Sequence, residues 1–139
     1  MMKLFQIIPL FSILLVVLLF LSMIGVFPEH MSTELSIFGH PLTITLPSGA
    51  TWMMDWGTVW IIIGVVVLYF ELMKSTHTSD TTSIEHALSA LVFVIYLGLW
   101  LTQSWANNDV FMILTGMSYV DVVAGFTITI AAARRDLTL

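Results

Sequence analysis

The chain has 139 residues, of which 58% are hydrophobic and only 9% are charged, and its formal net charge is −5. Globular proteins average roughly 45–50% apolar and about 25% charged residues, and a soluble domain of this size could not bury so much apolar surface. The acidic balance argues against a nucleic-acid partner, and a sequence without cysteine excludes disulfides, thiolate metal sites and cysteine nucleophiles. We therefore expect one integral membrane domain over residues 1–139, with the lipid bilayer as its main surrounding.

Four apolar segments are long enough to cross a bilayer, because about 20 apolar residues in a helix span the hydrocarbon core. An isolated strand would leave backbone groups unpaired in lipid, so each segment is expected to be helical. The segments cover residues 9–27, 52–73, 84–103 and 110–133. The sequence thus predicts an all-α membrane fold, a four-helix transmembrane bundle.

The first segment, residues 9–27, could instead be a signal peptide with Lys3 in its basic n-region. Its apolar stretch is longer than a typical h-region, and no small-residue cleavage site precedes Pro28. We therefore expect this segment to be a true membrane-spanning helix.

Residues 28–50 form a loop that is too short for a domain and contains a hairpin pattern. Two runs, residues 35–38 and 42–46, are separated by residues 39–41, and the second run alternates apolar residues with Thr. Because a bare two-stranded hairpin is marginal in water, we expect it to rest on the bilayer surface, on the helix ends or on a partner. Ser48 is expected to cap the second helix.

The other two connections are brief. Residues 75–83 are nearly all Ser, Thr, His and Asp, which is typical of a short connector. Residues 106–109 form a turn in which Asp109 can cap the last helix. The third and fourth helices are therefore expected to form a tight antiparallel pair.

The basic residues indicate an orientation. Lys3 precedes the first segment, Lys74 lies between the second and third, and Arg134 and Arg135 follow the fourth, so a four-span chain places them all on one side. By the positive-inside rule both termini are cytoplasmic, and we expect a multi-pass protein of the bacterial inner membrane with a short external β-hairpin. Tryptophan, which prefers the interface, falls toward the external end at Trp52, Trp56, Trp60, Trp100 and Trp105.

Asp121 is the outstanding residue of the fourth segment, because it falls near the bilayer midplane. An ionised carboxylate there costs roughly a few kcal/mol, so the group must be protonated, hydrated, hydrogen-bonded or paired. It belongs to a stripe of small and hydroxyl residues at helical spacing, a pattern that marks close helix contacts. The stripe comprises Thr115, Ser118, Asp121, Gly125, Thr129 and Ala132.

The third segment carries a matching face on which Tyr96 lies at about the depth of Asp121. Because the third and fourth helices are neighbours, we expect the Tyr96 hydroxyl to pair with the Asp121 carboxyl. The face comprises His86, Ser89, Phe93, Tyr96, Trp100 and Gln103.

Two interpretations of Asp121 stay open. It can be a protonated structural carboxyl that pins helices together or against a partner subunit. It can also be a proton or cation site, since ionisable groups inside membranes often mark such pathways. A single intramembrane acid makes a poor relay, which favours the structural interpretation.

Polar and aromatic residues also occupy the predicted interfaces. Glu71 lies about one turn before Lys74 and can pair with it or reach the headgroups; a role beside His86 in proton entry is the alternative. Four residues at helical spacing are expected to form an interface anchor with a packing notch, with a cofactor-stacking surface as the alternative. These are Trp52, Trp56, Trp60 and Gly64.

The sequence offers no motif that names a reaction. Haem needs axial ligands within the bundle, whereas His30 and His40 fall in the external loop and His77 and His86 fall on the cytoplasmic side. A metal held by His30, Glu34 and His40 would require the loop to fold back. We find no nucleophile–His–acid set, phosphate loop or pair of intramembrane carboxylates, and we expect no enzyme activity, no cofactor and no metal.

Parts of the chain resemble known sequences. Residues 119–136, YVDVVAGFTITIAAARRD, and residues 70–75, FELMKS, are similar to small uncharacterised bacterial inner-membrane proteins of about this length. That resemblance implies no activity. The first helix, the hairpin and the second helix together resemble the LapA-type lipopolysaccharide-assembly membrane proteins, which lack the third and fourth helices.

The predicted function follows mainly from what the chain lacks. We expect a non-catalytic accessory or scaffold subunit of a larger inner-membrane complex, which packs through the polar stripes of its third and fourth helices against other membrane subunits or copies of itself. The alternative is a small oligomeric proton-linked transporter or channel that uses Asp121. A haem- or quinone-linked enzyme subunit is a third class.

Overall fold

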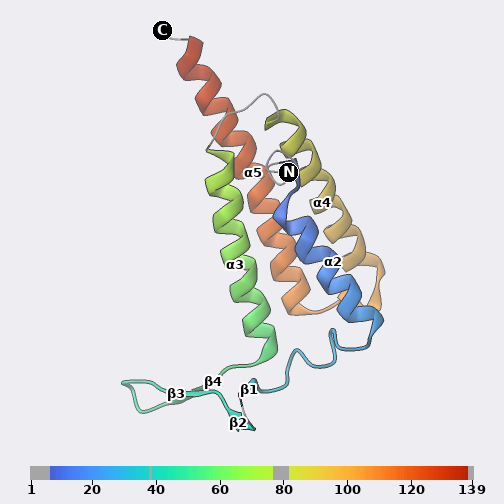
Figure 1. The fold of residues 1–139 in the computed structure, drawn as a ribbon, viewed down its shortest axis with the longest axis vertical. Coiled ribbons are helices and arrows are strands. Elements are labelled where there is room, and N and C mark those ends of the chain that lie inside the picture. Colours follow the sequence, from blue (N-terminus) through green and yellow to red (C-terminus); the bar gives the residue numbers. More distant parts are fainter. Residues whose placement is uncertain (1–6, 38, 77–81, 138–139) are drawn as a thin grey trace.

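The computed structural model describes residues 7–37, 39–76 and 82–137. Over these residues the fold is mainly helical, with two small antiparallel strand pairs that lie at one end of a helix bundle (Figure 1). We call this end the hairpin end. The helices are α2 (Leu10–Met23), α3 (Trp56–Ser75), α4 (Thr82–Thr102) and α5 (Asp109–Leu137), with one turn of 3-10 helix, η1 (Ser104–Ala106), between the last two.

Three of these helices are long and apolar enough to cross a membrane, over Trp56–Ser75, Ile84–Thr102 and Asp109–Arg134. Helix α2 has 14 residues, and at a rise of about 1.5 Å per residue its length is about 21 Å, less than the hydrocarbon thickness of about 30 Å. The first predicted span is therefore only partly helical.

The end of α2 explains its short length. Gly25 has a φ of +74°, a left-handed conformation that glycine adopts easily. The Gly25 N–H donates to the Ser22 carbonyl at 3.2 Å, and the Val26 N–H donates to the Leu21 carbonyl at 2.9 Å. These two bonds form the Schellman motif that closes many helices, so α2 stops at Met23 rather than near residue 27.

The strands form two hairpins rather than the single one expected. Strand β1 (Ser36–Ile37) pairs with β2 (His40–Pro41), and β3 (Thr43–Thr45) pairs with β4 (Thr51–Met53). The expected pairing of residues 35–38 with residues 42–46 is therefore wrong, except that the Leu42 N–H donates to the Leu35 carbonyl at 2.8 Å. Residues 43–45 pair with residues 51–53 instead.

A second turn is the reason for this difference. Gly39 and Gly49 both have a positive φ, +80° and +82°, which suits the tight turn of a hairpin. The run over residues 42–46 consequently folds forward onto residues 50–54, with the Leu46 N–H donating to the Ala50 carbonyl at 2.9 Å. Phe38, part of the expected first strand, lies outside the described residues.

The second hairpin also moves the start of the next helix. Trp52 lies on β4, and α3 begins at Trp56 instead of residue 52. The N-cap is Asp55, whose carboxylate accepts a hydrogen bond from the Thr58 N–H at 2.6 Å. Ser48, the expected cap, lies instead in the turn between β3 and β4.

Helices α4 and α5 pack together as the short connection predicts. The side chain that caps α5 is that of Asn108, whose amide oxygen accepts a hydrogen bond from the Phe111 N–H at 3.0 Å. Asp109, the expected cap, is the first residue of the helix. The cap is thus shifted by one residue.

Helix α5 packs along both α3 and α4, and α2 also contacts α3 and α4 (Figure 1). Aromatic rings form the centre of the apolar core. The Phe111 ring centroid lies 5.3 Å from that of Tyr96, 5.4 Å from that of Trp105 and 6.3 Å from that of Phe27, while Phe11 of α2 meets Tyr96 edge-on at 6.3 Å. These rings join all the helices except α3.

The outer surface of the bundle is apolar and much of its interior is polar. Large apolar side chains such as Val16, Val65, Leu91 and Ile130 are exposed on the four helices. Buried polar side chains instead gather between α3, α4 and α5. This arrangement suits a lipid surrounding, in which polar groups must find partners inside the protein.

Candidate functional site

A group of buried polar side chains lies in the half of the bundle away from the hairpin end. Six of its members are at most 9% exposed: Glu71 of α3, Glu85, His86 and Ser89 of α4, and Ser118 and Asp121 of α5. Two further residues contact them, Lys74 and Thr129. We call these eight residues the polar cluster.

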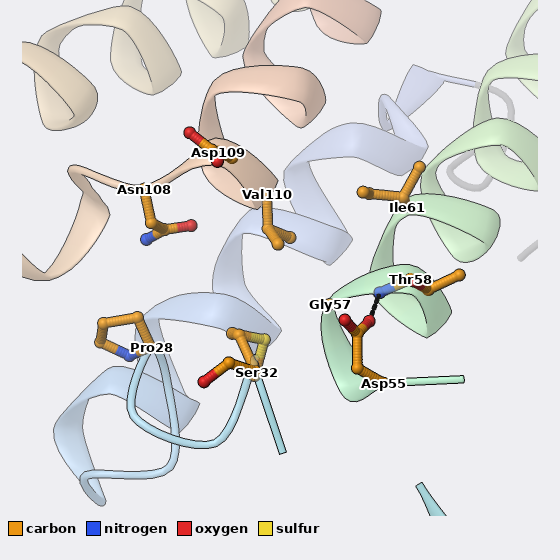
Figure 2. A pocket seen from close by; sticks show the side chains of 10 residues that line it. Pro28, Ser32, Asp55, Gly57, Thr58, Ile61, Asn108, Asp109 and Val110 are labelled. Carbon is orange, nitrogen blue, oxygen red and sulfur yellow. Dashed lines mark hydrogen bonds between the residues drawn. The ribbon is translucent and has the colours of Figure 1, made fainter. Parts of the chain in front are cut away.

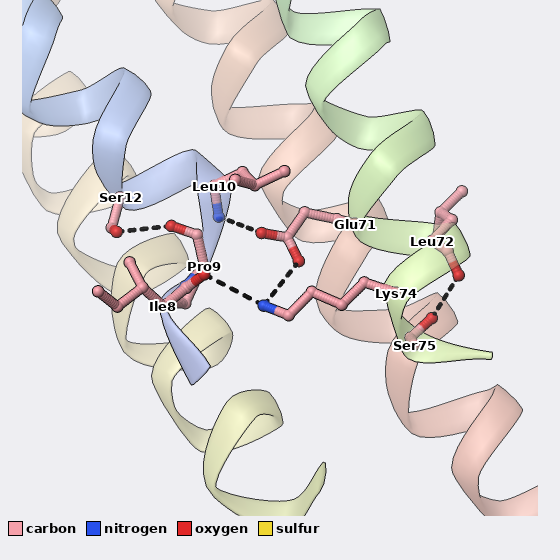
Figure 3. Close-up of polar contacts among 8 residues, drawn as sticks. All are labelled: Ile8, Pro9, Leu10, Ser12, Glu71, Leu72, Lys74 and Ser75. Atoms are coloured by element: carbon pink, nitrogen blue, oxygen red, sulfur yellow. Dashed lines mark hydrogen bonds and ion pairs between the residues drawn. The ribbon is translucent and has the colours of Figure 1, made fainter. Parts of the chain in front are cut away.

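Glu71 and Lys74 connect α3 to the start of α2 (Figure 3). One Glu71 carboxylate oxygen accepts a hydrogen bond from the Leu10 N–H, and the other lies 3.7 Å from the Lys74 ammonium. Lys74 also donates to the Ile8 carbonyl at 3.1 Å. The expected Glu71–Lys74 ion pair is present, and it additionally satisfies a free N–H at a helix start, where a negative charge is favourable.

Asp121 lies at the centre of the polar cluster. It interacts electrostatically with Glu71 and Lys74, and the Ser89 hydroxyl is within reach as a hydrogen-bond donor. Within the described residues, one Asp121 carboxyl oxygen and the Ser118 hydroxyl have no hydrogen-bond partner. A buried polar group without a partner costs about 1–3 kcal/mol, so this oxygen is a candidate position for a proton or another donor.

His86 joins α4 to α5. Its Nε2 lies 2.6 Å from the Thr129 hydroxyl oxygen, and that hydroxyl donates to the Gly125 carbonyl at 3.0 Å. In the tautomer that carries its proton on Nε2, His86 donates to Thr129 while the Thr129 hydroxyl donates to Gly125. The ring lies against Gly125, where an added Cβ would be 2.8 Å from ring atoms.

Tyr96 does not pair with Asp121, and this prediction is wrong. The Tyr96 hydroxyl donates to the Phe11 carbonyl of α2 at 3.2 Å, and its ring belongs to the aromatic core. The correct neighbour follows from counting along both helices from their common turn. Asp121 lies 13 residues after Asn108 and Ser89 lies 13 residues before Thr102, so these two occupy the same level.

The polar stripes of α4 and α5 meet each other inside the chain. Thr115, Ser118, Asp121 and Gly125 are all buried, and the Thr115 hydroxyl donates to the Phe111 carbonyl of its own helix at 2.8 Å. The central parts of both stripes are thus covered within the chain, whereas Gln103 at the end of the α4 stripe is exposed.

The tryptophan residues expected at the interface have different surroundings. Trp52 and Trp56 are exposed, whereas Trp60 is half-buried. Trp56 and Trp60 line a cavity of about 320 Å³, together with residues of α2 and the following loop. Gly64 accepts side chains of α5 closely, since an added Cβ would lie 2.4 Å from Leu114 Cδ2, as a packing notch requires.

A second hollow, of about 400 Å³, lies at the hairpin end between the starts of α3 and α5 (Figure 2). Its polar side chains include Asp55, Thr58, Asn108 and Asp109. In Figure 2 the Asp55 carboxylate points toward the Thr58 N–H, from which it accepts a hydrogen bond. Asp55 and Asn108 are both helix caps, so one oxygen of each side chain is engaged with a helix start.

Among residues 7–37, 39–76 and 82–137, no group of three or more His, Cys, Asp or Glu side chains is placed to hold a metal ion. His30, Glu34 and His40 of the loop are all exposed and form no such group.

Two parts of the polar cluster were missed by sequence reasoning. Glu85 reads in sequence as an ordinary first-turn acid of α4, yet it is only 9% exposed and acts electrostatically on Glu71 and His86. The backbone of residues 8–10 also contributes, and backbone groups leave no signal in a sequence.

Comparisons of the chain with protein-family models, with curated protein sequences and with solved structures find no match.

Proposed function

We propose that the protein is a non-catalytic accessory or scaffold subunit of a larger inner-membrane complex, or of an assembly of its own copies. The observation that carries the proposal is the role of the polar cluster in joining the four helices. Glu71 and Lys74 tie α3 to α2, and His86 bonds to Thr129 between α4 and α5. A bundle with apolar outer faces, whose described non-helical parts are short hairpins, loops and turns, is suited to packing against other membrane helices.

The proposed orientation places both termini in the cytoplasm of a bacterial cell. Lys74 and Arg134 lie at the ends of α3 and α5 away from the hairpins, and the described residues include no Lys or Arg at the hairpin end. Basic residues stay preferentially on the cytoplasmic side. The chain would then cross the inner membrane four times, with the hairpins outside.

Site-specific photo-crosslinking in native membranes tests the scaffold proposal. A photoreactive residue would replace Val16, Val65, Val94 or Val123, which are exposed on α2, α3, α4 and α5. Leu114, fully buried, is the matched control position on α5. We expect at least one outer face to crosslink a single recurring membrane protein or a second copy in fixed stoichiometry, while position 114 links only within the chain.

The scaffold proposal would be rejected by two results together. The first is the absence of a recurring crosslink from any of the four faces. The second is purification in mild detergent as a stable monomer with nothing bound.

One observation favours a second candidate function, a proton-linked transporter or channel. The Asp121 oxygen without a partner belongs to a buried carboxyl group that interacts electrostatically with Glu71. Buried acids of this kind commonly carry protons or ions through membranes. In this proposal Asp121 takes up and releases the proton.

Proton flux into proteoliposomes separates this candidate from the scaffold. Asp121→Asn keeps the shape of the side chain but cannot carry the charge, whereas Asp109→Asn makes the same change at an exposed position of the same helix. We expect Asp121→Asn alone to abolish flux while both variants stay folded. Equal flux in all variants, or no flux above protein-free vesicles for the native chain, would reject transport.

A further inference from the structure

The β3–β4 hairpin, residues 42–54, extends away from the bundle. Figure 1 shows it reaching sideways from the foot of α3, across the direction of the helices rather than along it. All residues of both strands are exposed. The hairpin therefore does not rest on the helix ends, which was one of the three supports considered from the sequence.

The two faces of this hairpin differ in polarity. Ile44 lies directly opposite Trp52 in the register, and side chains of directly opposed residues share a face. Leu46 lies two residues after Ile44 and shares the same face. Ile44, Leu46 and Trp52 are 45%, 43% and 38% exposed, respectively. The opposite face carries Thr43, Thr45, Thr51 and Met53.

The base of the hairpin indicates which way the apolar face turns. Leu42 and Met54 belong to the same alternating set as Ile44 and Trp52, and both are half-buried, whereas their neighbours Thr43 and Met53 are exposed. The apolar face is thus the one turned toward the body of the protein. The threonine-rich face is turned away.

The position of the hairpin along the chain sets its depth. Only Met54 and Asp55 separate β4 from α3, a helix long and apolar enough to cross a membrane. Residues 35–54 contain no Asp, Glu, Lys or Arg. An uncharged hairpin with an exposed Trp, held sideways at the end of a spanning helix, lies at the level where tryptophan prefers the headgroup region.

We propose that the apolar face of the β3–β4 hairpin, formed by Ile44, Leu46 and Trp52, lies in the interfacial layer of the lipid bilayer. Lipid is favoured over a protein partner because the face is turned toward the bundle side, has no charged group and continues directly from a membrane-spanning helix. The threonine hydroxyls of the other face then meet water and headgroups. This inference does not depend on the proposed function.

The absence of cysteine from the native sequence permits a clean labelling experiment. Ile44→Cys and Thr45→Cys place an NBD fluorophore on the two faces at adjacent positions, in protein reconstituted into phosphatidylcholine vesicles. We expect lipids that carry a nitroxide near the headgroup to quench the label at position 44 severalfold more strongly than the label at position 45. Aqueous iodide should show the opposite order.

A second pair, Leu46→Cys and Thr43→Cys, repeats the comparison in case one substitution disturbs the hairpin. Equal quenching of both faces by iodide would overturn the proposal. It would also be overturned if the label at position 44 were shielded from both quenchers and this shielding increased with the protein-to-lipid ratio. In that case a second copy of the chain would cover the face. Shielding in native membranes with full iodide access in pure lipid vesicles would assign the face to a protein partner and equally overturn it.

Discussion

The Asp55 carboxylate determines how α3 begins. It accepts a hydrogen bond from the Thr58 N–H at 2.6 Å, and its backbone forms an isolated β-bridge with Glu34. The hydrogen bonds from Thr58 lower the pKa of Asp55 below its ordinary value of 3.8, since they favour the ionised form. Asp55 thus fixes the helix start through its side chain, and its backbone bridge to Glu34 joins the start of α3 to the loop before the hairpins.

Replacing Asp55 with Ala should lower the free energy of unfolding by about 1 kcal/mol at neutral pH, the usual value of a helix cap. Asp55→Asn should lower the free energy of unfolding much less, because an amide oxygen can also cap the helix. Because the folded-state pKa is below 3.8, the stabilisation from the ionised cap is complete above that value and is lost as the pH falls through it toward the folded-state pKa. Unfolding in detergent micelles, followed from neutral to acid pH, measures both effects.

The cap of α5 provides the control. The Asn108 amide oxygen makes the equivalent bond to the Phe111 N–H at 3.0 Å, and an amide does not titrate. Asn108→Ala should therefore destabilise by a similar amount at every pH. If Asp55→Ala and Asn108→Ala showed the same pH profile relative to the native chain, the carboxylate of Asp55 would not be the titrating cap.

Single residues also mark the limit of what sequence could predict about the candidate site. The burial of Asp121 and its stripe followed from spacing, because a charge in an apolar helix needs protein around it. Its neighbour Ser89 could have been found by counting from the turn between α4 and α5. The contact of Glu71 with the Leu10 N–H could not, because it depends on where α2 begins and how it packs.

At the scale of helices, two glycines set the distances within the bundle. An added Cβ at Gly64 would lie 2.4 Å from Leu114 Cδ2 and 2.8 Å from the Met117 sulfur, both on α5. An added Cβ at Gly125 would lie 2.8 Å from the His86 ring on α4. Helix α5 therefore meets its two neighbours at positions where an added methyl group would force the Leu114, Met117 or His86 side chain to move.

Gly64→Ala and Gly125→Ala should each destabilise the bundle. Overpacking costs about 1–3 kcal/mol, and the better helix propensity of Ala recovers only about 1 kcal/mol. Gly125→Ala should also displace His86 from Thr129, so its effect should exceed that of a simple steric change. Thermal unfolding of the variants in detergent or nanodiscs measures the differences.

Gly98→Ala and Gly116→Ala are the matched controls, since nothing lies within 4 Å of a Cβ at either position. These variants should be neutral or slightly more stable than the native chain. Equal effects at all four glycines would show that helix propensity, not close packing, governs these positions.

The helices and the strands differ in how far sequence could define them. The long apolar runs predicted α3, α4 and α5 to within a few residues, because lipid leaves a chain few alternatives to a helix. The run over residues 42–46 has a turn signal on each side, at Gly39 and at residues 47–49. Local pattern alone does not decide whether this run pairs with the residues before the first turn or with those after the second. The structure uses both turns, and Trp52 consequently lies on a strand.

At the scale of the whole molecule, α2 and the loop after it run beside α3 over most of its length. Leu10 bonds to Glu71 near the end of α3, and the Met31 carbonyl accepts a hydrogen bond from the Gly57 N–H at 2.8 Å near its start. Residues 10–31 therefore extend from one end of α3 almost to the other, although only the first 14 of them, Leu10–Met23, are helical. Non-helical backbone is tolerated at membrane depth when protein covers it, and Phe27 and Met31 are buried.

This geometry predicts the sides from which single cysteines will react with a membrane-impermeant maleimide in bacterial cells that express the protein. If the segment over residues 10–31 crosses the membrane beside α3, cysteine at position 8 should react from the same side as cysteine at Thr76, and cysteine at position 29 should react from the same side as cysteine at Asn107. The positive-inside rule further assigns Glu29→Cys and Asn107→Cys to the outside, so both should react in intact spheroplasts. It assigns Ile8→Cys and Thr76→Cys to the inside, so both should react only in inverted vesicles. Leu114→Cys, in the fully buried core, should react from neither side. Reaction of positions 8 and 29 from one side would show that α2 enters the bilayer without crossing it, whereas exchange of the two sides for all four positions would reverse the orientation and leave the four-span arrangement intact.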